Sequence, residues 1–154
     1  MEEARVAVDA ELARVAELAR EFRAELSEER GGLLWETREA RPEPVFEAFS
    51  ALLGHDDATV LVGVYEDAIV GYGVAEVEQL RDGSRLGVIS EIYVETEARG
   101  VGVGELLVEG LVAFCIGRDC AGVDAAALPG HRQAKNFFER AGFTARLLVM
   151  HRNR

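Results

Sequence analysis

The most telling stretch of this chain is a run of alternating glycines, Arg99-Gly100-Val101-Gly102-Val103-Gly104. It follows a β-patterned segment, residues 87–94, and leads into an apolar stretch of helical periodicity, residues 103–116. Glycines let backbone N–H groups approach a ligand with no Cβ in the way. The start of a helix adds unpaired N–H groups and the positive end of the helix dipole. A strand, a glycine turn and a helix in this order therefore predict a site for phosphate.

Two familiar phosphate loops do not fit the run. A dinucleotide-binding fingerprint needs a glycine three residues after its second glycine, but Glu105 follows Gly102 at that spacing. A P-loop needs a Gly-Lys pair, whereas the single lysine of the chain is Lys135. The spacing that fits is Arg/Gln-x-x-Gly-x-Gly/Ala, with Arg99, Gly102 and Gly104 in the fixed places. This run resembles the acyl-CoA-binding loop of the GNAT superfamily of N-acyltransferases.

A second motif lies near the end of the chain. Residues 131–143 read His-Arg-Gln-Ala-Lys-Asn-Phe-Phe-Glu-Arg-Ala-Gly-Phe, which is similar to the family's Asn-x-x-Ala-x-x-Phe-Tyr-Glu-Lys-x-Gly-Phe. The resemblance implies that acetyl-CoA is the acyl-donor substrate and that no metal is needed. In the family the strand end holds the pantetheine arm, a backbone N–H such as that of Val94 faces the thioester carbonyl, and the loop amides hold the pyrophosphate. The implied cofactor-binding residues are Ile92, Tyr93, Val94, Arg99, Gly100, Val101, Gly102, Val103, Gly104, Glu105, His131 and Phe138.

The periodicity of the chain predicts the order β-α-α-β-β-β-α-β-α-β. Expected strands cover residues 5–8, 59–65, 69–80, 87–94, 122–128 and 143–151; expected helices follow the N-cap Asp9 to residue 26 and cover 45–53, 103–116 and 131–141, with a loop at 28–44. This order predicts a mixed α/β fold. It resembles the GNAT fold, a mostly antiparallel mixed sheet of about six strands flanked by four helices. Residues 1–154 are expected to form a single domain.

Composition limits the partners. The chain carries 17 basic and 28 acidic residues, a net charge of −11, which repels nucleic acid and anionic membranes and attracts a protonated amine. We therefore expect neither nucleic acid nor a membrane as a partner. The longest apolar stretch, residues 106–117, is too short to span a bilayer, and the acidic start Met1-Glu2-Glu3 is unlike a signal peptide, so we expect a cytoplasmic location. Two cysteines, Cys115 and Cys120, provide no disulfide framework and no zinc-ligand spacing.

The general acid of the expected reaction departs from the family pattern. The tyrosine that commonly protonates the departing thiolate in this family falls at Phe138, which has no hydroxyl. Tyr72, Tyr93 or water are the alternatives, because a thiol with a pKa near 8.5 leaves tolerably as its anion.

The general base departs as well. Family members often place Glu or His at positions matching Val88 or Ser90, which alternate onto the face shared with Ile92, and here neither is ionisable. Glu91 is next to Ser90 in sequence, but we expect it on the opposite face unless the strand is bulged. A buried structural partner for a backbone group or an arginine and a catalytic base are equally good interpretations of this residue. The Ser90 hydroxyl is a candidate to orient a water that relays the proton of the amine. Glu76 is a further candidate for the base, although its position also fits a solvated strand face.

Trp35 and Glu36 lie in the loop that, in this family, commonly closes over the acceptor amine. An equally good interpretation makes Trp35 the hydrophobic anchor of a long loop. The catalytic candidates are thus Glu91, Ser90 and Tyr93, and the substrate-binding candidates are Trp35, Glu36 and Glu76.

These observations favour an N-acetyltransferase that moves an acetyl group from acetyl-CoA to a primary amine in a ternary complex. The alternative is a non-catalytic acyl-CoA-binding or regulatory module of the same fold, which the missing ionisable groups at Val88, Ser90 and Phe138 would suit. The sequence leaves the acceptor open. A homodimer is a further expectation, because the apolar residues 147–150 would form a strand that is free to pair with a second copy.

Overall fold

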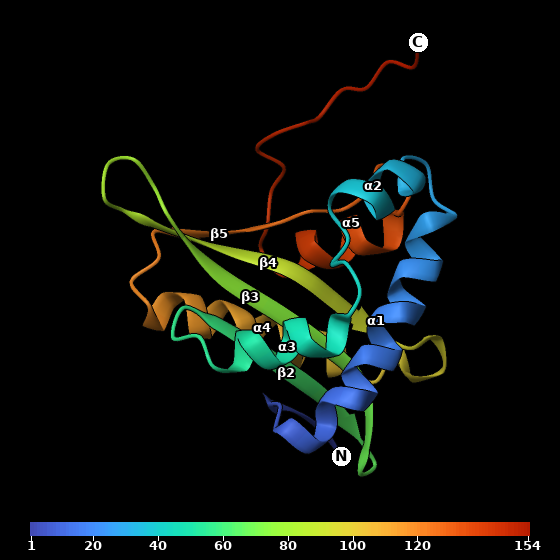
Figure 1. The fold of residues 1–154 in the computed structure, drawn as a ribbon, viewed down its shortest axis with the longest axis vertical. Helices are drawn as coiled ribbons and strands as arrows, with labels where there is room; N and C mark the ends of the chain where they lie inside the picture. Colours follow the sequence, from blue (N-terminus) through green and yellow to red (C-terminus); the bar gives the residue numbers. More distant parts are fainter.

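The computed structural model describes all 154 residues and is built around one five-stranded sheet with the order β1-β2-β3-β4-β5 (Figure 1). The first four strands pair antiparallel, and β5 pairs parallel to β4. The strands are β1 (Glu2–Val6), β2 (Ala58–Tyr65), β3 (Ala68–Gln79), β4 (Arg85–Val94) and β5 (Gly122–Ala125).

Helices cover both faces of this sheet. One apolar cluster joins α1 and α3 to β2, β3 and β4, and a second joins α4 to the opposite face. Along β2 the buried side chains alternate between the clusters, with Val60 and Val62 on the α1 side and Leu61 on the α4 side, which explains why this strand is apolar at nearly every position. The helices are α1 (Leu12–Ser27), α2 (Gly32–Arg38), α3 (Val45–Leu53), α4 (Val103–Gly117) and α5 (Arg132–Arg140).

Glycines let α4 lie close against the sheet. A Cβ at Gly63 would overlap the Val103 side chain, and one at Gly87 would overlap the Cys115 side chain. Because α4 begins within the glycine run, at Val103, this close packing fixes where the run is held relative to β4.

The predicted mixed, mostly antiparallel sheet with helices on both faces is confirmed, and several details differ. The strand predicted at 5–8 lies at Glu2–Val6, and the helix predicted to follow an Asp9 N-cap begins at Leu12, after a 3₁₀ turn at Asp9–Glu11. The loop predicted at 28–44 contains α2, which starts after Gly31 in a left-handed conformation (φ +81°). β5 ends at Ala125 rather than at residue 128. The strand predicted at 143–151 does not form, so the sheet has five strands rather than about six.

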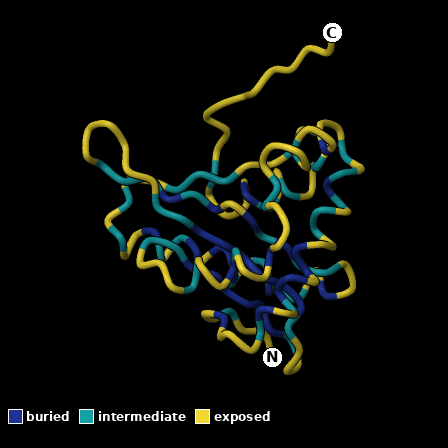
Figure 2. The backbone as a smooth tube through the Cα atoms, in the orientation of Figure 1, coloured by how far each residue is buried: buried dark blue, intermediate teal, exposed yellow.

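Residues 144–154 form an extended tail that leaves the body of the molecule (Figure 1) and is exposed along its length (Figure 2). An apolar stretch makes a strand only when a neighbouring strand supplies hydrogen-bond partners, and within one copy the tail has none.

Candidate active site

A β-bulge in β4 sets the geometry of the site. Glu91 pairs with Val74 and Ile89 pairs with Ala75, so Ser90 is an extra residue with no partner on β3. The bulge reverses the alternation of side chains. Ile89 packs on the α4 side of the sheet, whereas Glu91 faces the α1 and α3 side.

The bulge corrects one expectation from the sequence. Val88 and Ser90 were predicted to share a face with Ile92. In the structure Ile92 packs on the α4 side together with Ile89, so Val88, which precedes Ile89, lies on the face opposite Ile92. Glu91 was predicted to lie on the face opposite Ile92 unless the strand was bulged. Its carboxylate points into the hollow described below.

Glu91 is a buried carboxylate, 7% exposed, with a donor on each oxygen. The Tyr72 hydroxyl donates to Oε1 at 2.8 Å, and the Arg41 Nε donates to Oε2 at 2.6 Å. Burial and the Glu91 charge raise the pKa of Tyr72 well above its ordinary value, so its hydroxyl keeps its proton and remains a donor. The two contacts fix the Glu91 carboxylate in one orientation.

Arg41 connects Glu91 to its neighbours. Its Nη2 donates to Glu76 Oε2 at 3.3 Å and to Ser90 Oγ at 3.4 Å, and its guanidinium lies 5.6 Å from the centre of the Phe49 ring. Burial opposes its charge, but the carboxylates of Glu91 and Glu76 together outweigh that, and the pKa of Arg41 is raised above its usual value. Arg41 comes from the segment between α2 and α3, and no spacing in the sequence pointed to it.

These groups line a hollow of about 270 Å³ between α1, the α2–α3 segment and the sheet. Trp35 forms part of its wall and meets Phe22 edge to face, with ring centroids 5.5 Å apart. Glu76 lines it too, but Glu36 is exposed and lies outside it. The lining residues are Ala19, Arg20, Phe22, Arg23, Trp35, Arg38, Glu39, Ala40, Arg41, Pro42, Val45, Glu76, Ser90 and Glu91.

The glycine run lies at the end of the same strand. Gly102 is the N-cap of α4 in a left-handed conformation (φ +95°), and a Cβ there would meet nothing nearer than Glu2 at 3.8 Å. Leu106 donates the first backbone hydrogen bond of the helix, to the Gly102 carbonyl at 3.2 Å. The N–H groups of residues 100–105 find no acceptor within the chain. Successive free N–H groups at a helix start are an anion site.

The strands open beside this run. The last β4–β5 pair joins Ile89 to Ala125, whereas β4 continues to Val94. The edge of β4 between those points has no strand beside it. Glu91 and Val94 lie about 10 Å apart along an extended chain. A Cβ at Gly104 in the glycine run would lie 3.9 Å from the Val94 side chain, so the run is close to the end of β4.

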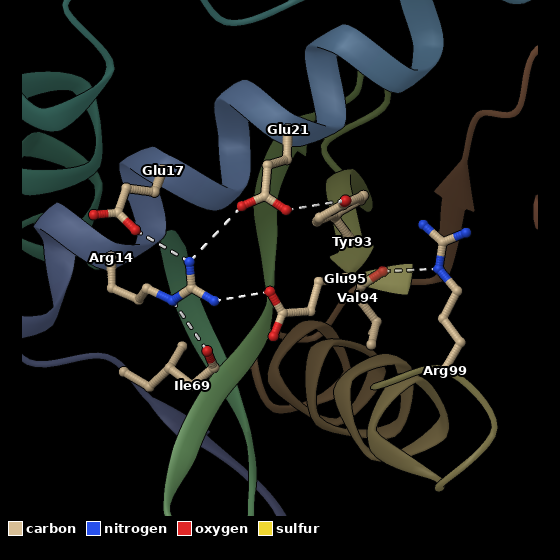
Figure 3. A network of polar contacts seen from close by, with 8 residues as sticks. All are labelled: Arg14, Glu17, Glu21, Ile69, Tyr93, Val94, Glu95 and Arg99. Atoms are coloured by element: carbon tan, nitrogen blue, oxygen red, sulfur yellow. Dashed lines mark hydrogen bonds and ion pairs between the residues drawn. The ribbon is translucent and has the colours of Figure 1, made fainter. Parts of the chain in front are cut away.

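A polar network holds α1 against this end of the sheet (Figure 3). Arg14 donates from α1 to the Ile69 carbonyl at 3.1 Å and to Glu95 Oε2 at 3.0 Å. Tyr93, on the Glu91 face of β4, donates to Glu21 Oε1 at 3.4 Å. Burial and the charge of Glu21 raise the pKa of Tyr93 to about 12, so this hydroxyl is protonated at neutral pH.

Arg99 joins β4 to α1. Its Nε donates to the Val94 carbonyl at 2.8 Å (Figure 3), its Nη2 lies 2.8 Å from Glu25 Oε1, and its guanidinium lies 5.5 Å from the centre of the Tyr93 ring. His131 Nε2 lies 3.5 Å from the other Glu25 oxygen. The carbonyl of Val94, a residue that the resemblance assigns to acetyl-CoA binding, thus accepts a hydrogen bond from an arginine.

Phe138 is buried and apolar in its surroundings. Its ring contacts Phe137 and Phe143, with centroids 5.4 Å away in each case. No group of three or more His, Cys, Asp or Glu side chains is arranged to hold a metal ion. None of the helices combines the length and apolarity that a membrane crossing requires.

Comparisons with known proteins place this architecture. The profile of the acetyltransferase (GNAT) family matches residues 16–143. Glucosamine 6-phosphate N-acetyltransferase 1 from rice, Oryza sativa subsp. japonica, is 33% identical over 111 residues, which cover 68% of this chain and 63% of the rice protein. The match thus spans less than two thirds of that relative.

Solved structures share the fold. A mutant protein from Bacillus halodurans has a TM-score of 0.84 at 22% identity over 98% of both chains. The structure of AAC(6')-Iy in complex with a CoA-containing bisubstrate analog has a TM-score of 0.76 at 16% identity, over 100% of this chain and 99% of the other.

Proposed function

This chain belongs to the GNAT acetyltransferase family, and on that premise we propose that it transfers an acetyl group from acetyl-CoA to a primary amine in a direct ternary complex. One observation carries the proposal: a buried carboxylate, Glu91, faces a hollow and lies on β4, whose end at Val94 is close to the glycine run with its free N–H groups. An acceptor in the hollow and a thioester along the end of β4 would meet beside Glu91 and Tyr93.

The glycine run would hold the pyrophosphate of acetyl-CoA. Residues 100–105 supply N–H groups that no protein acceptor uses, and the positions of Gly100 and Gly102 leave open space where a side chain would stand. The start of α4 adds its dipole. A bound CoA would move the Arg99 side chain, because the pantetheine arm would hydrogen-bond to the Val94 carbonyl that Arg99 now occupies.

The transfer itself needs two proton movements. The amine nitrogen attacks the thioester carbon, the C–N bond forms and the C–S bond breaks, so one proton leaves the nitrogen and one reaches the sulfur. Glu91 is placed to accept the first, directly or through a water held by Ser90. Tyr93 is placed to supply the second, since burial keeps its hydroxyl protonated.

The hollow suits an amine that also carries an acidic group. Its walls hold three carboxylates, Glu39, Glu76 and Glu91, which attract an ammonium. They also hold four arginines, Arg20, Arg23, Arg38 and Arg41, although the chain as a whole is strongly acidic. A carboxylate or phosphate on the acceptor would compete with Glu39 and Glu43 for these guanidinium groups. The rice relative acts on a phosphorylated amino sugar, as its name states.

Thiol release from acetyl-CoA tests the proposal, with acceptors supplied as matched pairs: glucosamine and its 6-phosphate, and amino acids and their amides. We expect turnover, with the acidic member of each pair preferred. Glu91→Gln should lower kcat by about 10²–10⁴-fold, the usual range for a positioned acid or base, while Glu109→Gln on the exposed face of α4 leaves it unchanged. Equal activity of Glu91→Gln and the parent would remove Glu91 from the reaction.

A non-catalytic acyl-CoA-binding module is the second candidate. Two observations favour it: Phe138 offers no hydroxyl, and both oxygens of Glu91 are already engaged by Arg41 and Tyr72. Stabilisation by acetyl-CoA with no thiol release across the whole panel of amines would decide for this candidate.

A further inference from the structure

Arg41 occupies the position on Glu91 that the ammonium of an acceptor would need. Its Nε lies 2.6 Å from Glu91 Oε2, and its Nη2 lies 3.3 Å from Glu76 Oε2 and 3.4 Å from Ser90 Oγ. All three partners line the hollow, and oxygen atoms of this kind are what a protonated amine binds. The other oxygen of Glu91 accepts from Tyr72. While Arg41 stays in place, an amine therefore meets no oxygen of Glu91 that lacks a donor.

The Arg41–Glu91 pair is largely buried, which makes it costly to break from one side. The side chain of Arg41 is 18% exposed and that of Glu91 is 8% exposed. A buried charge that loses its partner and gains no other is strongly unfavourable. An amine with no further charge that took Glu91 would leave the guanidinium in this state. The pair therefore disfavours simple amines.

The other carboxylates near the hollow do not replace Glu91 as a partner. Glu39 and Glu43 are paired with arginines of their own, with a nitrogen–oxygen distance of 3.0 Å in each case. Glu76 keeps its contact with Arg41, but its side chain is 42% exposed, so water screens the attraction. A displaced Arg41 therefore has to find its anion in the ligand.

One edge of the Arg41 guanidinium is free for such an anion. Nε and Nη2 make all the hydrogen bonds of this side chain, so Nη1 has no acceptor within the chain. Nη1 is also accessible, because the one buried side-chain nitrogen or oxygen without a partner is Nε of Arg85. A carboxylate or phosphate in the hollow can thus bind Nη1 while the pair with Glu91 is intact, and the planar guanidinium suits both anions.

We propose that Arg41 is a specificity-determining residue, which holds the place of the ammonium on Glu91 and yields it only to an amine that also carries an acidic group. The acid of the acceptor binds the free edge of the guanidinium and draws it off Glu91, and the ammonium takes the vacated oxygen. Both buried charges keep a partner in the complex. This exchange rests on the proposed acetyl transfer, and it frees Glu91 Oε2 to accept the proton of the amine only when such an acceptor is bound.

Thiol release with glucosamine 6-phosphate and with glucosamine tests the exchange through kcat and KM. In the parent chain we expect the phosphorylated acceptor to be preferred in kcat/KM by about 10²-fold or more, the order that an unpaired buried charge costs. Arg41→Gln should remove most of this preference, because glucosamine then leaves no guanidinium unpaired and its kcat is retained or rises. Arg41→Lys, which keeps the charge, should keep the preference in part.

Arg81→Gln, at an exposed turn, is the matched control and should leave the kinetics of both acceptors unchanged. If Arg41 only supports the fold, Arg41→Gln lowers kcat for both acceptors alike and the preference survives. That result would overturn the proposal.

Binding measured without transfer separates this exchange from the reaction. Trp35 is the single tryptophan of the chain and lines the same hollow, so its fluorescence reports a bound ligand. With CoA in place of acetyl-CoA, glucosamine 6-phosphate should bind more tightly than glucosamine or glucose 6-phosphate by about the same factor, and Arg41→Gln should remove that advantage. This pattern without any thiol release would refute the transfer and keep the exchange. Equal affinity of the three ligands, including no binding by any of them, or an advantage that persists in Arg41→Gln, would overturn the exchange whether or not thiol is released.

Discussion

Tyr72→Phe probes the structural support of the buried carboxylate. The substitution removes one oxygen from a side chain that is 0% exposed and leaves the ring in place against Phe49. What is lost is the 2.8 Å hydrogen bond to Glu91. Hydrogen bonds to charged groups contribute about 1.5–3 kcal/mol, and a buried acceptor left without its donor loses the full amount. We expect the free energy of unfolding to fall by about 2 kcal/mol, and Tm to fall by about 4–8 °C for a chain of this length.

Thermal and urea unfolding measure this loss, and Tyr93→Phe is the matched control. The Tyr93 hydroxyl meets Glu21 at 3.4 Å, and Glu21 has a side chain that is 44% exposed, so its removal should cost about 0.5 kcal/mol or less. If Tyr72→Phe proves as stable as the parent, the Glu91 carboxylate does not depend on this donor, and the argument for its fixed orientation fails.

Three further outcomes are expected. Gly102→Trp should abolish the rise in Tm that acetyl-CoA causes, while Gly83→Trp, at a hairpin turn with a similar left-handed conformation (φ +89°), should lower Tm and keep that rise. Phe138→Tyr should raise kcat by about tenfold if it supplies a general acid to the thiolate; an unchanged kcat would leave that role to Tyr93 or water. Because the pKa of Tyr93 is raised to about 12 from an ordinary 10.0, the folded state keeps this proton longer than the unfolded chain, and stability present below pH 10 should decline as the pH rises toward 12. Tyr93→Phe should flatten that decline in urea unfolding measured at each pH.

Elements with strong local patterns could be predicted from the sequence. The glycine run marked the start of α4, and the apolar spacing before it marked β4. The final helix ended, as expected, just before Gly142, which has the left-handed conformation (φ +94°) that glycine tolerates.

Features that depend on distant partners could not be predicted. The bulge at Ser90 has no glycine or other local signal, because it arises from the fit of β4 against β3. Arg41 reaches Glu91 from fifty residues away in sequence, with only two prolines nearby to mark its segment. The strand predicted at residues 143–151 was wrong for this structure, because residues 147–150 have the composition of a strand but make no backbone hydrogen bond to a neighbouring strand.

The bulge in β4 has a consequence for how related chains are aligned. One inserted residue carries every side chain before it to the opposite face of the sheet, so a relative that lacks the insertion presents a different set of positions to the acceptor. An alignment anchored on the glycine run and extended backwards without a gap would pair Glu91 correctly but would match Ile89 and Val88 to residues that face the other way. Residue equivalence upstream of Ser90 must therefore be assigned by face, and a one-residue length change in this strand is a simple route by which acetyltransferases of this fold exchange the groups around the acceptor.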